Sequence, residues 1–147
     1  MEQRINILET EPEATKAMYA LSGYIEKSPL TSTHKELIKI RASQLNGCAF
    51  CIDMHTKDAL KQGESAQRIF LLNAWKEVHD LYTKEERIIL AMTEAVTLIH
   101  QGGIPDELYR EAQAVFEEHY LAQVIMAVVL INSWNRIAIS SLFQPAK

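Results

Sequence analysis

The chain has only two cysteines, Cys48 and Cys51, and they lie at the junction of two helical patterns. Asn46 and Gly47 interrupt the first pattern, and a second begins at Cys48 and continues to about Gln62. The Cys-x-x-Cys pair is therefore expected on the first turn of a helix. Unpaired backbone N–H groups and the helix dipole favour a negative charge such as a thiolate there. A thioredoxin fold is excluded, because its CxxC follows a strand and this pair follows a helix.

His55 extends this pattern along the same helix. Cys48 and Cys51 are i,i+3 neighbours, and Cys51 and His55 are i,i+4 neighbours, so the three side chains should share one face. A dithiol beside an imidazole is typical of redox chemistry. Two structural alternatives stay open: His55 as a core histidine, and Glu36 as half of a capping box with Thr33.

Helical periodicity covers the rest of the sequence, and no alternating strand pattern, internal repeat or low-complexity segment interrupts it. We therefore predict an all-α fold, a single-domain bundle of about six or seven helices over residues 1–147. Capping boxes are expected at Thr10 with Glu13 and at Thr83 with Glu86. The expected helices cover approximately residues 10–27, 31–46, 48–62, 66–78, 83–101, 105–115 and 118–141.

Composition and charge indicate which kinds of binding partner the chain can have. With 48% hydrophobic and 23% charged residues, the chain is an ordinary globular sequence. The net charge is −4 and basic residues do not cluster, which argues against nucleic acid. The N-terminus lacks a signal-peptide pattern and the apolar run Val124–Ile131 is too short for a bilayer, so we expect a cytoplasmic protein without a membrane partner. The segment Leu121–Ile131 is apolar nearly all round, which predicts a buried helix and a homo-oligomer.

The spaced set Glu36, Cys48, Cys51 and His55 resembles a known motif. In the alkylhydroperoxidase D group of the carboxymuconolactone decarboxylase family, a glutamate precedes the CxxC by twelve residues and a histidine follows it. All four positions are present in this chain.

The resemblance spans about residues 30–141. It includes the run NGCAFC, the helix that follows to Gly63, the helix from Thr83 to Ala95 and the terminal run INSWNRIAI, all similar to peroxidase-related members. One position departs from the pattern. Well-studied members carry a histidine just before the second cysteine, where this chain has Phe50, so their proton relay lacks one group here.

The resemblance implies a CxxC-dependent thiol peroxidase that acts on alkyl hydroperoxides. Cys51 would attack the peroxide, Cys48 would condense with the sulfenic acid, and Glu36 and His55 would relay the proton. The residues alone do not decide which thiol attacks. The helix N-terminus acts most strongly on Cys48, whereas the position of His55 favours Cys51. The resemblance also implies reduction by a lipoyl-bearing or thioredoxin-like partner, no bound cofactor, and a dimer, trimer or hexamer.

Three alternatives remain at this level. The pair could be a redox sensor or take part in disulfide exchange without peroxidase turnover. Lactone decarboxylation occurs in the same family, but in members that lack the cysteine pair. Zinc is a weaker rival, because Cys48, Cys51 and His55 offer three suitable ligands and no second cysteine pair completes the site. A fourth ligand would have to come from His34, His79, His100 or His119.

Overall fold

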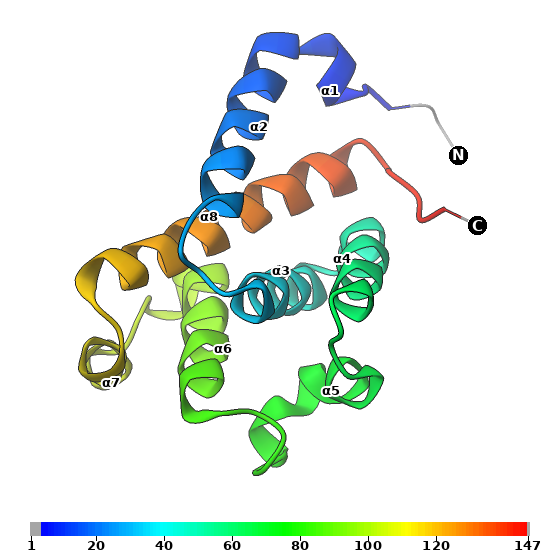
Figure 1. Cartoon of the computed structure of the whole chain (residues 1–147). Helices are drawn as coiled ribbons and strands as arrows, with labels where there is room; N and C mark the ends of the chain where they lie inside the picture. Colours follow the sequence, from blue (N-terminus) through cyan, green and yellow to red (C-terminus); the bar gives the residue numbers. More distant parts are fainter. Residues whose placement is uncertain (1–3, 147) are drawn as a thin grey trace.

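The computed structural model describes residues 4–146, and these residues form a bundle of helices without strands (Figure 1). The predicted all-α fold is confirmed, and the seven predicted helices correspond to α2 through α8. The α-helices are α1 (Ile7–Thr10), α2 (Pro12–Glu26), α3 (Ser32–Asn46), α4 (Ala49–Lys61), α5 (Ala66–Leu71), α6 (Lys84–Thr97), α7 (Asp106–Val115) and α8 (Glu118–Ser140). Two 3₁₀ helices, η1 (Leu72–Glu77) and η2 (Ile99–Gln101), follow α5 and α6.

The central helix is α3, which packs against α4, α6 and α8 (Figure 1). Ile38 and Ala42 face a hydrophobic core shared with α2, α6, α7 and α8. Leu37 and Ile40 face a second core formed with α4, α5, η1 and α6. Because α3 is buried on several sides, a side chain that it presents toward α4 is held on a rigid element.

The long apolar helix α8 crosses the bundle against α2, α3 and α6. Its buried side chains include Leu121, Val124, Val128 and Ile131, which confirms the predicted core helix. Within residues 4–146, α8 is the one helix whose length and composition would also suit a membrane span. Its packing in the hydrophobic core is equally typical of the core helix of a water-soluble bundle.

Three predictions at helix starts and ends are wrong. The helix predicted over 83–101 ends as an α-helix at Thr97, and the 3₁₀ helix η2 follows after Leu98. Thr10 does not cap α2, because it belongs to the short helix α1 and its hydroxyl donates to the Asn6 carbonyl. The helix predicted over 66–78 changes to 3₁₀ geometry after Leu71. In a 3₁₀ helix residues three apart eclipse, so Leu72 and Trp75 are both directed into the core. Trp75 also donates to Glu94 of α6 at 2.7 Å.

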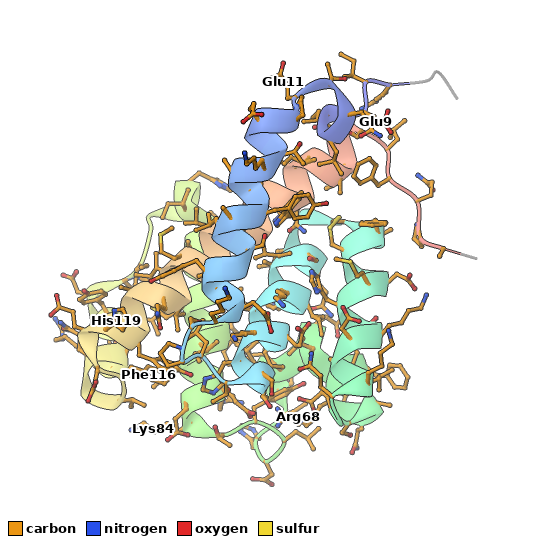
Figure 2. The ribbon with its side chains drawn as sticks, turned by 45° about the horizontal axis from the view of Figure 1, so that its top comes forward. Glu9, Glu11, Arg68, Lys84, Phe116 and His119 are labelled. Carbon is orange, nitrogen blue, oxygen red and sulfur yellow. A yellow bond between two sulfur atoms is a disulfide. The ribbon has the colours of Figure 1, made fainter. Side chains whose placement is uncertain are left out.

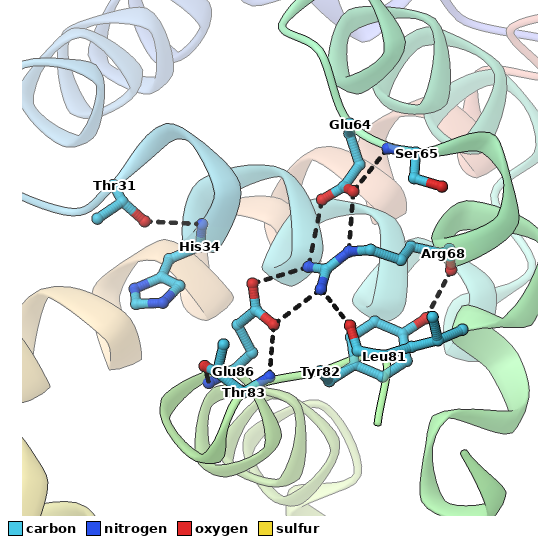
Figure 3. A network of polar contacts seen from close by, with 9 residues as sticks. All are labelled: Thr31, His34, Glu64, Ser65, Arg68, Leu81, Tyr82, Thr83 and Glu86. Carbon is cyan, nitrogen blue, oxygen red and sulfur yellow. Dashed lines mark hydrogen bonds and ion pairs between the residues drawn. The ribbon is translucent and has the colours of Figure 1, made fainter. Parts of the chain in front are cut away.

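A polar network closes the end of the bundle opposite the termini, where Figure 2 labels Arg68. The Arg68 guanidinium pairs with Glu86 at 2.7 Å and Glu64 at 2.8 Å, and it also donates to the Leu81 carbonyl (Figure 3). Glu86 completes the predicted capping box with Thr83, which is confirmed. This bidentate arrangement fixes α5 and the segment before α6 beneath α3.

A second polar network joins the C-terminal end of α3 to α8. The Asn46 amide donates to Asn132 and Asn135, at 2.9 Å each, and the Asn135 amide donates to the Ser43 hydroxyl at 2.9 Å. Asn135 is fully buried. The network therefore ties the last turn of α3 to the middle of the core helix, immediately before the cysteine pair.

Replacement of Asn135 by alanine should lower the free energy of unfolding by about 2 kcal/mol, because Ser43 and Asn46 each lose a buried partner. Urea unfolding followed by circular dichroism measures the loss. Ser140→Ala, at an exposed position on the same helix, is the matched control and should change stability by less than about 0.5 kcal/mol. Equal losses in both variants would contradict the role of the network.

The sequence predicts a homo-oligomer, and a measurement of the molecular mass in solution tests this prediction. Met126 and Val129 on α8 remain 38% and 41% exposed, so part of this helix faces outward in the isolated chain. We expect light scattering at micromolar concentration to give a multiple of 16.7 kDa. A mass of one chain would mean that these side chains stay in water.

Candidate active site

The cysteine pair lies where α3 ends and α4 begins. Gly47 has a left-handed backbone with φ +69°, which ends α3, and the Cys48 N–H donates to the Ser43 carbonyl at 3.0 Å. Cys48 is the N-cap of α4, and its Sγ accepts from the Cys51 N–H at 3.4 Å. The predicted placement of the CxxC at the start of a helix is thus confirmed.

Cys48 and Cys51 form a disulfide, with their Cα atoms 5.3 Å apart. The structure therefore describes the oxidised form of the pair. Both residues are buried, at 1% and 2% exposure, and Ala138 of α8 packs against them. Phe50 and Phe143 cover the same cluster and meet edge to face, with ring centroids 5.6 Å apart. Both cysteines are therefore shielded from bulk solvent.

Glu36 and His55 meet between α3 and α4. The His55 Nδ1 lies 3.4 Å from the Glu36 Oε2, an ion-pair distance that is long for a hydrogen bond. Both residues are buried. The N-cap of α3 is Thr31, which accepts from the His34 N–H, so the alternative capping box of Glu36 with Thr33 is wrong.

The charge on Glu36 is stabilised from two sides. Burial alone would raise the pKa of Glu36, but the contact with His55 and the ion pair with Lys39 outweigh it and hold that pKa below its ordinary value. Lys39 Nζ lies 2.9 Å from Oε1, while the second oxygen faces His55. Glu36 is thus a carboxylate that can orient the His55 imidazole.

Cys51 and His55 both line a cavity of about 570 Å³ between α2, α3, α4 and α8. Its walls are mainly apolar and include Tyr19, Phe50, Met54, Ile131, Trp134 and Phe143. Of the lining residues, Tyr19 of α2 and Met54 of α4 are exposed to solvent. Cys48 is not among the lining residues, so Cys51 is the cysteine that a molecule in the cavity approaches.

Glu36 lines a second, smaller cavity of about 230 Å³. Its walls are polar and include Ser32, Thr33 and Gln62, together with the Glu64, Arg68 and Glu86 network of Figure 3. His55 thus lines the apolar cavity together with Cys51, whereas its partner Glu36 lines the polar cavity.

The structure brings all four predicted residues, Glu36, Cys48, Cys51 and His55, into one region. Their catalytic roles remain predictions. Residues 4–146 hold no group of three or more metal-ligating side chains, and among the possible fourth zinc ligands His34 instead contacts the Tyr120 hydroxyl at 2.6 Å. Sequence reasoning missed Lys39, although its i,i+3 spacing from Glu36 is a recognisable signal.

The fold and the cysteine helix define an all-α dithiol protein of the alkylhydroperoxidase D type. The model of the carboxymuconolactone decarboxylase family matches residues 12–94, and the chain belongs to this family. It is 46% identical over 140 residues to the uncharacterised protein YdfG of Bacillus subtilis, covering 95% of each chain.

Solved structures give the same fold. ATU0492 of Agrobacterium tumefaciens, of unknown function and named as a candidate antioxidant defence protein AhpD, has 40% identity and a TM-score of 0.94 over 99% of both chains. The debrominase Bmp8 has 17% identity and a TM-score of 0.82, covering 95% of this chain and 74% of that one. Such low identity shows the fold alone.

The lowered pKa of Glu36 predicts a pH dependence of stability. A carboxylate whose pKa is depressed by folding stabilises the native state above its unfolded pKa and loses this effect as pH falls through the folded value. Relative to Glu36→Gln, wild type should therefore lose unfolding free energy as the pH falls below about 4.5, the ordinary pKa of a glutamate. Urea titrations measure it, and Lys39→Met should weaken the dependence. A pH-independent difference would contradict the prediction.

Proposed function

We propose that the protein is a thiol peroxidase, which reduces an organic hydroperoxide with its CxxC pair and is then reduced by a dithiol. One observation carries the proposal. Cys51 and His55 line the same apolar cavity, whereas Cys48 lies behind Cys51 and Glu36 contacts His55 from outside that cavity. This arrangement gives each of the four residues a separate task.

In the reduced protein, the Cys51 thiolate attacks the outer peroxide oxygen. An S–O bond forms, the O–O bond breaks, and the leaving alkoxide takes a proton from His55, giving an alcohol and Cys51 sulfenic acid. Glu36 is a positioning residue, because it contacts Nδ1 and so leaves Nε2 of His55 for the proton transfer. The small polar cavity beside Glu36 supplies a route by which the proton is replaced.

Cys48 then attacks the sulfur of Cys51. The S–S bond forms, the S–O bond breaks, and hydroxide leaves with a proton as water. The two Cα atoms lie 5.3 Å apart in the disulfide, and the i,i+3 spacing keeps the two cysteines neighbours on α4. The product is the disulfide state that the structure describes.

A dithiol reductant closes the cycle. Attack on the sulfur of Cys51 from the cavity would release Cys48 as a thiolate at the N-terminus of α4, where the helix dipole stabilises it. The second thiol of the reductant then releases Cys51, so two thiols become one disulfide. Burial of both cysteines under Phe50 and Phe143 supports a slender lipoyl arm over the face of a thioredoxin-like protein.

In the alternative function, a redox sensor, the same two cysteines form a disulfide but the protein does not consume peroxide catalytically. A sensor would respond once per chain to a peroxide and show no sustained consumption with a dithiol present. Exchange of the disulfide with a dithiol alone therefore supports neither function over the other, and peroxide turnover decides between them.

The test is a turnover assay with cumene hydroperoxide and dihydrolipoamide. Cys51→Ser should abolish activity, while Cys48→Ser should form one equivalent of sulfenic acid and then stop. Glu36→Gln and His55→Ala should each lower kcat/KM by about 100-fold and alter its pH profile, because the proton relay is lost. Lys57→Ala, on the exposed side of α4, is the matched control and should stay within about twofold of wild type. Stoichiometric oxidation without turnover would contradict the peroxidase.

A further inference from the structure

Lys35 is a buried lysine in the wall of the apolar cavity. It lies on α3, next to Glu36, and retains only 7% exposure. Its ammonium donates to the backbone carbonyl of Glu26, in the last turn of α2. An ammonium has three N–H donors. Among residues 4–146, the Glu26 carbonyl is the one hydrogen-bond acceptor of the Lys35 ammonium.

No carboxylate of the described residues lies within ion-pair distance of Lys35. The other lysine of the cavity, Lys39, is paired with Glu36 at 2.9 Å. Glu26, an exposed residue that also lines the cavity, forms no ion pair with Lys35. Lysine is rarely buried without a carboxylate partner, and an anion in the cavity would supply one to Lys35.

We propose that the cavity binds apolar carboxylates, with Lys35 as the partner of the carboxylate and the side chains of α8 around the apolar body. Ile131 and Trp134 form that apolar wall, and Lys35 supplies the polar contact that orients a ligand in such a pocket. The volume of about 570 Å³ is within the range of small-molecule sites.

If the cavity binds apolar carboxylates, the peroxide substrate is an apolar acid that carries a hydroperoxide group. This step rests on the proposed peroxidase function. With its carboxylate on Lys35 and its chain along α8, an acid that carries a hydroperoxide group presents the O–O bond to Cys51 in the same cavity. Charge-assisted hydrogen bonds to the Lys35 ammonium favour the acid over a neutral analogue by about 10- to 100-fold in affinity.

The test is an equilibrium titration of the oxidised protein with decanoate and with decanol, which requires no turnover. The chain has two tryptophans, of which Trp134 lines the cavity, so fluorescence reports binding and Trp134→Phe identifies the signal. Wild type should bind decanoate at least tenfold more tightly than decanol. Lys35→Met should bring this ratio close to one and leave decanol affinity within about twofold, because only the charge is lost.

Two further variants separate the charge of Lys35 from its structural tie to α2. Lys35→Arg should keep the preference for decanoate, and Lys27→Met, at an exposed lysine nearby in the chain, should leave the ratio unchanged. Equal affinity of wild type for both compounds would overturn the proposal, as would a preference that survives in a folded Lys35→Met variant. A preference for decanoate without peroxide turnover would support the ligand site and overturn the peroxidase.

Discussion

The site depends on the tie between the last turn of α3 and α8. Asn135 is buried in the core helix and holds Ser43 and Asn46, which fixes the end of α3 before Gly47 turns the chain. Cys48 then caps α4 with no intervening loop. The direction of α4 is set by this junction, and with it the contact that His55 makes with Glu36 one helix away. Polar side chains in the core therefore determine where the redox pair lies.

Much of this arrangement follows from local signals in the sequence. Asn46 and Gly47 predicted the break between helices, and the i,i+4 spacing predicted His55 on the same side of α4 as Cys51. The capping box of Thr83 and Glu86 formed as expected. The equivalent box at Thr10 did not, because Asn6 starts the single turn α1 just before α2, and a helix of four residues is too short to leave a periodic pattern.

The cavity could not be predicted in this way. Its walls combine Tyr19 of α2, Lys35 of α3 and Trp134 of α8 with Phe143, which is far from the cysteines in the chain. No spacing rule connects such distant positions, since only tertiary packing brings them together. Lys35 illustrates the point: in sequence it is an ordinary helical lysine, and its unusual feature is burial beside an apolar space.

The chemistry proposed for Cys51 needs more than an acidic thiol. If the pKa of a thiol falls from about 8.5 to about 6.5, the thiolate fraction at neutral pH rises roughly 25-fold, but the loss of nucleophilicity takes back about eightfold. Only about a threefold gain remains. Any larger acceleration must come from the position of the peroxide and from protonation of its leaving oxygen. The cavity beside Cys51 supports the first effect, and the contact between His55 and Glu36 supports the second. Catalytic power would therefore reside in the geometry between α3 and α4 more than in the helix dipole.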